Sequence, residues 1–568
     1  MANDSTKSNN TGAYYASTVD DVIRDDTEQY LNSIDVDNPP TPAEIRCELL
    51  RCIRNDVALY NSIAQGGCKM RYPRMLSEAQ IASILLHLNH IVNIDFSGNM
   101  DDDSDTNVIA IYDKEKGIYS TKRKTFYKMI SEYRYDLKDK DFNEIIKMLE
   151  RRAPVVKPCS NRDIVIVNNG IFNYKTKQLE PFSPDYIFTS KTSVDYNPYA
   201  QNVVIHNDED NTDWDIESWV DSLSDDTDIV RLLWQVIGAV VRPYNAWDKV
   251  VLLACETGSN GKGTLIELLR QLCGDGNWAS IPIGDFSKEF SLEPLISVNA
   301  VLVDENDTNT YLDKCGLFKA CVTGDAITIN RKFKSPISYR SHVFMVQCMN
   351  SVIRVKDKSD SFYRRLLPIP MTKRFYGRER KYIKHDYLKR KDVLEYTLYK
   401  VLNMNYYQLS VPKASEELLG IYKVENDTIR QFVEQFFGDN LFKWDLLPFN
   451  FLYDLYKAWF KRNNPTGLIE SAIKFNNELI RIVNENDFDF YCEDKSKQYR
   501  PYNRMDEPEC LIYDYDLVDW KNLQYKGDDI NKICHPTLKV HYRGLLRKVR
   551  GNVQLQNDVS ERNDYYED

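Results

Sequence analysis

A glycine-rich stretch near the middle of the chain has the residue types that surround phosphate groups. Residues 255–264 read CETGSNGKGT, directly after the apolar, β-branched run of residues 250–254 and directly before a helical apolar pattern at residues 265–269. A strand, a glycine-rich turn and a helix bring backbone N–H groups and a helix N-terminus around phosphate oxygens. The order of these three pieces predicts a phosphate loop that binds a nucleotide.

Positions of this loop have separate expected roles. We expect Lys262 to reach the β and γ phosphates as a point charge. The residues expected to bind ATP are Gly258, Ser259, Asn260, Gly261, Lys262, Gly263 and Thr264. The stretch departs from the pattern G-x-x-x-x-G-K-S/T at Glu256 and at Gly263. Because Gly263 stands where a hydroxyl normally contacts Mg²⁺, either Thr264 takes that role or water and downstream acids hold the metal.

An acidic pair follows the next apolar strand of the predicted core. Residues 299–303 read NAVLV, which predicts a strand, and Asp304 and Glu305 come at its carboxyl end. Phosphoryl-transfer sites use one such acid to hold Mg²⁺ and another to polarise the attacking water. We therefore predict Asp304 as a metal ligand, together with Thr264, and Glu305 as the residue that polarises water.

Three further segments carry a resemblance to a known family. Residues 319–334 read KACVTGDAITINRKFK, a strand-like run ends in Asn350, and residues 360–370 read DSFYRRLLPIP. With the phosphate loop and the acidic pair, this order resembles the superfamily 3 helicase domain of phage and plasmid primase-helicases. Residues 168–198 also resemble the region that precedes the ATPase domain in phage, plasmid and poxvirus primase-helicases.

The resemblance implies roles for these segments. Asn350 would sense the γ-phosphate or orient the lytic water, and Arg365, with Arg364 as the other candidate, would be an arginine finger on ATP bound to the neighbouring subunit. The hairpin tip expected to contact DNA consists of Arg331, Lys332, Phe333 and Lys334. A surface salt-bridge pair and a basic surface turn are the alternative interpretations of the arginines and of the hairpin.

We expect an α/β fold in four parts. Residues 1–40 are polar and acidic and end in Asn-Pro-Pro, which predicts a disordered tail. Residues 41–205 are expected to form an α+β accessory domain, and residues 206–400 the AAA+-type P-loop ATPase domain with a preceding helical segment. Residues 401–568 are expected to form a mostly helical, winged-helix-like region, in which a helix at about residues 471–484 is a candidate for DNA binding.

The bulk composition limits the location and the partners of the chain. The sequence has 568 residues, a net charge of -11 and 12 cysteines. A negative protein contacts nucleic acid only through local basic surfaces, and scattered cysteines are expected to be reduced thiols. Since we find neither an apolar run long enough to cross a bilayer nor a signal-peptide pattern, we expect a cytoplasmic protein without membrane contact.

The leading hypothesis is an ATP- and Mg²⁺-dependent DNA helicase. The resemblance implies a homo-hexamer that moves 3′ to 5′ on a single DNA strand and acts in replication initiation of a phage, plasmid or genomic island. We expect no primer synthesis. A DNA-binding initiator that uses ATP only as an assembly switch is one alternative, and an AAA+ remodeller that does not act on nucleic acid is another.

Overall fold

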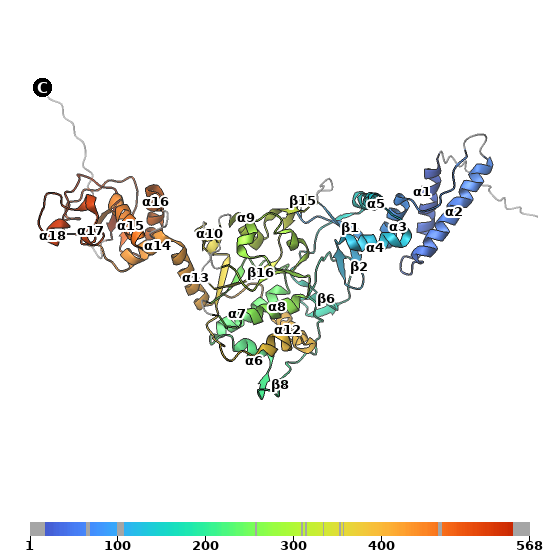
Figure 1. Cartoon of the computed structure of the whole chain (residues 1–568), viewed down its shortest axis with the longest axis horizontal. Helices are drawn as coiled ribbons and strands as arrows, with labels where there is room; N and C mark the ends of the chain where they lie inside the picture. The colour runs from blue at the N-terminus through green and yellow to red at the C-terminus, as the bar shows by residue number, and fades with distance from the viewer. Residues whose placement is uncertain are drawn as a thin grey trace, which may run out of the picture. The chain divides into compact units, whose positions relative to one another are not determined.

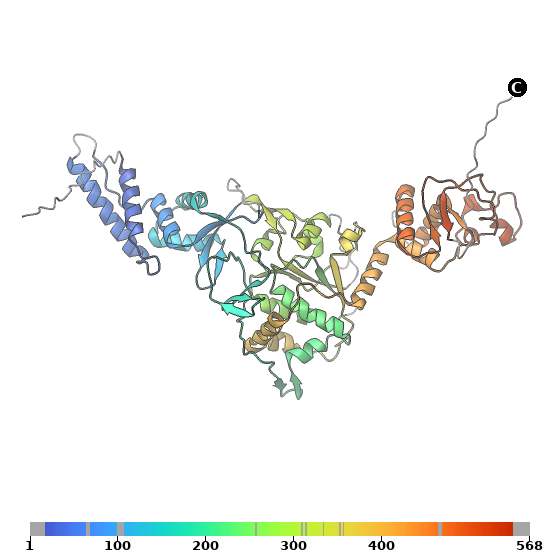
Figure 2. The ribbon, with the colours of Figure 1, turned by 180° about the vertical axis from the view of Figure 1, so that it is seen from behind.

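The computed structural model divides the chain into two compact units, residues 1–419 and residues 420–568, whose elements are labelled in Figure 1 and seen from behind in Figure 2. It describes residues 18–63, 69–98, 107–255, 258–307, 311–312, 315–332, 334–350, 354–355, 357–463 and 469–548. Among the helices of these residues, none is both long and apolar enough to cross a membrane. The boundary between the units falls within α13 (Lys413–Asn426).

The first unit begins with a pair of packed helices, α1 (Val19–Asn32) and α2 (Pro42–Ile63). Helix α1 lies in the segment that the sequence predicted as a disordered tail, so the structure differs from that prediction at residues 19–32. Its apolar Val22 and Leu31 are buried, whereas most of its acidic residues are not, and Thr18 caps its N-terminus. The segment is therefore an amphipathic helix despite its acidic composition.

Three more helices and a small sheet complete this N-terminal part. The helices are α3 (Glu78–Leu88), α4 (Arg123–Tyr133) and α5 (Asp139–Arg152). The strands are β1 (Ile91–Ile94), β2 (Val108–Asp113), β3 (Ile118–Ser120) and β4 (Val155–Val156), in the order β3-β2-β1-β4. Helix α5 buries Phe142, Ile145 and Leu149 at helical spacing, and these side chains join the core beneath α3.

Two further antiparallel sheets connect this part to the central sheet. The first contains β5 (Ile164–Val167), β6 (Gly170–Asn173) and β7 (Gln178–Glu180), and the second contains β8 (Ile205–Asn207) and β9 (Thr212–Trp214). The predicted Asn-Gly turn joins β5 to β6. Phe172 and Tyr174 from this region belong to the same buried core as the central sheet, so these small sheets are packed onto it.

The central sheet has five parallel strands in the order β11-β12-β16-β10-β18. These strands are β10 (Val250–Ala254), β11 (Trp278–Ala279), β12 (Ala300–Val303), β16 (Phe344–Met349) and β18 (Leu366–Pro370). Strands β10, β12 and β16 are buried along their whole length, as expected for parallel strands that are covered on both faces. This arrangement confirms the predicted α/β class with a parallel sheet consistent with a P-loop core.

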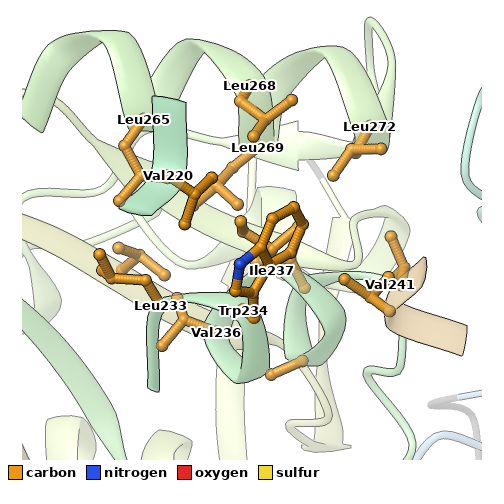
Figure 3. Close-up of a cluster of buried hydrophobic side chains, with 14 of the residues drawn as sticks. Val220, Leu233, Trp234, Val236, Ile237, Val241, Leu265, Leu268, Leu269 and Leu272 are labelled. Atoms are coloured by element: carbon orange, nitrogen blue, oxygen red, sulfur yellow. The ribbon is translucent and has the colours of Figure 1, made fainter. Parts of the chain in front are cut away.

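Helices α7 (Thr227–Val240) and α8 (Lys262–Cys273) pack closely against one another beside the sheet. Figure 3 shows Leu265, Leu268 and Leu269 of α8 facing the side chains of Leu233 and Ile237 of α7. Leu265, Leu268, Leu269 and Leu272 recur at the spacing of one helix face, and all four are fully buried. This packing fixes the direction of α8, and hence the position of its N-terminus.

The remaining elements of the first unit surround the sheet. The helical ones are α6 (Ile216–Asp221), η1 (Ile283–Ser287), η2 (Glu293–Ser297), α9 (Cys315–Thr323), α10 (Asp360–Tyr363), α11 (Lys381–His385), η3 (Tyr387–Lys389) and α12 (Lys391–Asn403). The strands are β13 (Tyr311–Leu312), β14 (Ala326–Arg331), β15 (Lys334–Arg340) and β17 (Arg354–Val355). Strands β14 and β15 form an antiparallel hairpin, while β13 pairs with β17.

The second unit combines helices with a three-stranded antiparallel sheet in the order β19-β21-β20. Its strands are β19 (Leu446–Pro448), β20 (Phe490–Tyr491) and β21 (Gly544–Arg547). Its helical elements are α14 (Thr428–Val433), η4 (Glu434–Gly438), α15 (Phe449–Asn463), α16 (Ala472–Glu485), α17 (Leu511–Asp514), η5 (Val518–Trp520) and α18 (Ile530–Ile533). Helix α16 coincides closely with the helix that the sequence predicted at residues 471–484.

Candidate nucleotide-binding site

Three neighbouring parallel strands bring the predicted nucleotide-binding residues to one edge of the central sheet. Strand β16 lies between β12 and β10, with Val303 opposite Gln347 and Ala254 opposite Met349. The acidic pair follows β12, Asn350 follows β16, and the phosphate loop follows β10. Because parallel strands end at the same edge, segments far apart in the sequence meet there.

The phosphate loop enters α8 through two residues with a left-handed backbone. Ser259 has a φ of 58°, and Gly261, which caps the helix, has a φ of 85°. A Cβ atom on Gly261 would lie 2.8 Å from Leu223 Cδ2, so both backbone conformation and space call for glycine. The helix begins at Lys262, where its first N–H groups have no partner within the helix and suit a phosphate. Glu256 lies outside the described residues.

Lys262 is buried and connects the phosphate loop to the end of β16. Its Nζ donates hydrogen bonds to Cys255 O at 3.2 Å, to Met349 O at 3.1 Å and to Asn350 Oδ1 at 2.7 Å. Burial lowers the pKa of this ammonium group, with small opposing contributions from nearby acidic groups that include Asp304. The structure therefore brings the predicted loop lysine and the predicted sensor asparagine into direct contact.

Asp304 lies against the first turn of α8, at the position where the loop departs from the strict pattern. A Cβ atom on Gly263 would lie 2.8 Å from Asp304 Oδ1, closer than real Cβ contacts. The carboxylate thus occupies space that the side chain of a serine or threonine at this position would need. The structure therefore places the carboxylate of Asp304 directly against Gly263, in the first turn of α8.

The residues after Asp304 include one that the sequence analysis missed. Glu305 is exposed, as a group that polarises water requires, whereas Asn306 is buried. Asn306 accepts a hydrogen bond from Ile283 N at 3.0 Å and donates to Gln347 Oε1 at 3.0 Å and Cys348 O at 3.1 Å. These bonds fix the acidic pair relative to β16. A glutamine within an otherwise apolar strand was the signal in the sequence for such a buried polar network.

The two arginines before β18 have different surroundings. Arg364 is exposed, whereas Arg365 Nη1 donates to Ser361 O and to Ser361 Oγ, which lie one helical turn earlier. Val250 N donates to Arg365 O, and Lys249 Nζ donates to Arg364 O. Both arginines therefore lie where β10 and β18 begin, at the edge opposite the phosphate loop. The structure does not bring them to the nucleotide site of their own subunit.

The predicted basic hairpin is present, and its cations differ in orientation. Strands β14 and β15 pair from Ala326 to Arg340, and the tip of the hairpin lies between Arg331 and Lys334. Lys332 and Lys334 are exposed, while Arg331 Nε donates to Ser335 O at 2.9 Å and is turned back onto the hairpin. Phe333 lies outside the described residues. Lys332 and Lys334 are thus exposed cations at the tip of the hairpin, where a phosphate backbone would meet positive charge.

A segment that the sequence analysis did not assign to the site lies on the phosphate loop. This post-β18 segment, residues 371–386, directly follows β18 and contains α11. Phe375 N donates to Ser259 O at 2.7 Å, and Ser259 Oγ donates to Glu379 Oε1 at 3.1 Å. Farther along, Lys384 Nζ lies 3.9 Å from Asp304 Oδ2. The basic run KRFYGRERK at residues 373–381 was the signal that could have drawn attention to it.

In the second unit, the basic side chains of the candidate DNA-binding helix α16 form ion pairs with nearby acidic side chains. Its N-terminus is capped by Ser471. Lys474 pairs with Glu470 at 2.7 Å, and Arg481 pairs with Glu478 at 2.8 Å. An exposed helix neutralised in this way attracts phosphates weakly, so the positive charge that DNA would need is not concentrated on this face.

Three family profiles match separate parts of the chain. Residues 100–225 match the family described as D5 N terminal like, and residues 424–517 match the family described as poxvirus D5 protein-like. Residues 254–365, which contain the phosphate loop, the acidic pair and the arginines, match a family of unknown function, DUF5906. No curated protein sequence matches the chain.

The solved structures with a partial likeness include those of two proteins, NrS-1 and JCV helicase. The apo C-terminal region of NrS-1, residues 305–718, is 11% identical, with 83% of this chain and 100% of that chain covered and a TM-score of 0.41. A structure of JCV helicase with a bound small molecule is 16% identical, with 39% of this chain and 64% of that chain covered and a TM-score of 0.23. These TM-scores are below the level at which a common fold follows from the likeness alone.

Proposed function

Because this chain belongs to the poxvirus D5-like family of superfamily 3 helicase ATPases, and is thus of the class of NTP-driven DNA helicases, we propose that it hydrolyses ATP to move 3′ to 5′ along single-stranded DNA. We further propose that it acts as a homo-hexamer in replication initiation of a phage, plasmid or genomic island. The cytoplasm is the compartment that we expect for this activity.

The observation that carries the proposal is the contact network around Lys262. Its buried ammonium group bonds three oxygen acceptors, which belong to the phosphate loop and to the residues at the end of β16. We expect it to exchange those acceptors for the β- and γ-oxygens of a triphosphate. Asn350 accepts a hydrogen bond from this ammonium group, so binding of the γ-phosphate would change the hydrogen bonds of Asn350 at the end of β16. Glu305, which is exposed directly after Asp304, would polarise the attacking water.

The acidic residues at the site fit a Mg²⁺ ion. Mg²⁺ usually retains several waters and is bound by one or two carboxylates together with substrate phosphates. Asp304 is partly exposed and lies against the first turn of α8, so its carboxylate is available to such an ion. The ion would neutralise charge on the β- and γ-phosphates, while Asp304 and Thr264 are the side chains that we propose to hold it.

Two features support the assignment to a ring that grips DNA. Arg364 is exposed at the edge of the sheet away from its own phosphate loop, which is where a residue that serves the neighbouring subunit has to be. Lys332 and Lys334 are exposed on a hairpin tip, where they would contact the phosphates of a single strand with Phe333 between them. Hydrolysis would then depend on the adjacent subunit, and movement of the hairpin would depend on the nucleotide.

Single-turnover unwinding of a forked DNA by Glu305→Gln tests the motor assignment. We expect the variant to bind ATP and DNA as the parent does and to lose unwinding, because the water is no longer polarised. The matched control is Glu289→Gln, which removes an exposed carboxylate elsewhere in the same unit and should unwind normally. A Glu305→Gln protein that still unwinds would refute the motor and support the ATP-switched initiator instead.

The hairpin assignment has its own test. We expect Lys332→Ala combined with Lys334→Ala to abolish stimulation of the ATPase by single-stranded DNA while leaving the unstimulated rate unchanged. If stimulation survived this double substitution, the hairpin would not be the DNA contact. An ATPase that no DNA stimulates, even in the parent protein, would favour a remodeller that does not act on nucleic acid.

A further inference from the structure

We propose that Lys384 is a second phosphate-binding lysine of the nucleotide site, supplied by the same subunit and directed at the terminal phosphate. This inference rests on the proposed ATPase function and assigns a role in it to the post-β18 segment. Lys262 approaches the triphosphate from the phosphate loop, and Lys384 would approach it from the side of Asp304.

The post-β18 segment is anchored on the phosphate loop by both main-chain and side-chain bonds. Ser259, whose φ of 58° puts it in the left-handed region, accepts a bond from Phe375 N through its carbonyl and donates one to Glu379 through its hydroxyl. The Phe375 ring also lies 3.6 Å from the place of a Cβ atom on Gly261. The segment is therefore attached to the phosphate loop and forms part of the wall of the same site.

Helix α11 continues from this anchor and packs against α8, the helix whose N-terminus receives the phosphates. Ile383 of α11 is buried in the core shared with α8, which holds the helix in place, while its neighbour Lys384 keeps 34% of its side chain exposed. The ammonium group is thus carried by a fixed helix and ends beside the acid of the site. It is positioned by packing, and yet accessible to a ligand.

The distance between Lys384 and Asp304 leaves this lysine available to a phosphate. Their closest N and O atoms are 3.9 Å apart, beyond hydrogen-bond length, so the pairing with Asp304 does not occupy a donor of the lysine. Asp304 would hold a Mg²⁺ ion that neutralises charge on the β- and γ-phosphates, so a cation next to Asp304 would lie near the terminal end of the triphosphate. The oxygens of the terminal phosphate would then be the acceptors that Lys384 contacts, whether or not the ion is bound.

The two lysines differ in a way that assigns them different tasks. Lys262 is 7% exposed and already bonded to three oxygens, whereas Lys384 is partly exposed and makes, within the part of the chain that the structure describes, a long ion pair with Asp304. Lys262 would hold any nucleotide that has a β-phosphate. Lys384 would distinguish ATP from ADP, because only ATP extends to it.

Titration calorimetry with ATP and with ADP, on the full chain with and without Mg²⁺, tests this role. For Lys384→Met we expect about a tenfold weaker affinity for ATP, the loss of one charge-assisted bond, and less than about a twofold change for ADP. Lys384→Arg should restore most of the preference for ATP. Lys389→Met, which removes an exposed lysine nearby in sequence, is the matched control and should bind both nucleotides as the parent does.

The outcomes separate the inference from the proposed function. Weakened ATP binding that persists without Mg²⁺ supports direct phosphate contact, whereas a change seen only with Mg²⁺ means that Lys384 acts only on Asp304 and overturns the proposal. Equal losses for ATP and ADP, or no loss, also overturn it. Thermal melting confirms that each variant is folded, and Lys384→Gln provides a second variant if the methionine form is not. A parent protein that binds neither nucleotide would refute the ATPase function itself.

Discussion

Substitution of Gly263 by alanine tests the geometry between the phosphate loop and the acidic pair. An added Cβ atom would lie 2.8 Å from Asp304 Oδ1 and 3.3 Å from Oδ2, whereas ordinary contacts begin at 3.4 Å. The carboxylate therefore has to retreat by about 0.6 Å. Since a displacement of about 1 Å in a catalytic arrangement costs on the order of 100-fold in rate, we expect at least a tenfold loss of kcat for ATP hydrolysis.

The same substitution should barely change stability. Alanine is favoured over glycine in a helix by about 0.5–1 kcal/mol, and the group that has to move is the end of a partly exposed side chain. The assay is steady-state ATP hydrolysis over a range of Mg²⁺ concentrations, with thermal melting alongside. We expect a lower kcat and about a tenfold higher half-saturating Mg²⁺ concentration, because the displaced carboxylate belongs to the proposed metal ligand.

Gly316→Ala is the matched control for this prediction. Gly316 lies in α9, and a Cβ atom there would meet nothing within 4 Å. The control should gain the helical preference of alanine and keep the activity and Mg²⁺ dependence of the parent. If Gly263→Ala also kept both, Asp304 would not be the residue that positions the metal, and the assignment of the acidic pair would have to be abandoned.

Three further predictions concern other parts of the first unit. Burial, and then Asp56, raise the pKa of Asp26 to about 7, so folding stability is lost as the pH rises from about 4 to 7. Asp26→Asn should therefore raise the free energy of unfolding above pH 7 by on the order of 2 kcal/mol and leave it unchanged at pH 4, as measured by melting. Burial lowers the pKa of Lys177 to about 8, so stability should rise between pH 8 and 10.5 by on the order of 1 kcal/mol, and Lys177→Met should remove that rise. Arg364→Ala should reduce hydrolysis by about 10³-fold with unchanged ATP affinity, whereas Arg365→Ala should mainly lower the melting temperature; the opposite pattern in the two assays would reverse these roles.

The order of motifs along the chain was sufficient to predict which segments meet at the edge of the central sheet. Parallel strands that alternate with helices end at a common edge, so Lys262, Asp304 and Asn350 could be placed together from their positions after three apolar runs. The helix-forming apolar spacing after Lys262 likewise predicted α8. These features could be predicted because the apolar pattern of a strand or a helix is spread over all of its residues.

Features that depend on tertiary contacts could not be predicted in this way. The departure at Gly263 looked like a lost metal ligand in the sequence, and only the structure relates it to the carboxylate of Asp304. Lys384 follows a basic run that resembles a solvated surface, and its place beside Asp304 depends on how α11 packs against α8. Helix α1 could not be predicted from composition, because its many acidic residues are typical of a disordered tail and its buried face has few apolar side chains, among them Val22 and Leu31.

The choice between the two arginines shows how a backbone register constrains the proposed assembly. Leu366 is paired with Val250 and Pro370 with Ala254, so β18 and β10 run together from the arginines to the phosphate loop. At about 3.3 Å per residue, five residues separate the two ends by roughly 16 Å. Arg364 at the start of β18 therefore lies too far away to contact the γ-phosphate of its own subunit.

This separation divides the proposed site between cis and trans contributions. Lys262, Lys384 and Asp304 belong to one subunit and would bind the nucleotide without help. We then expect an arginine of the next subunit to stabilise the negative charge that develops on the transferred phosphoryl group. Such an arginine raises kcat by a factor of about 10³ to 10⁵. Mixing Arg364→Ala chains with Lys262→Ala chains should therefore restore hydrolysis at those interfaces where an intact site faces an intact arginine. A mixture that stays inactive would refute the shared site.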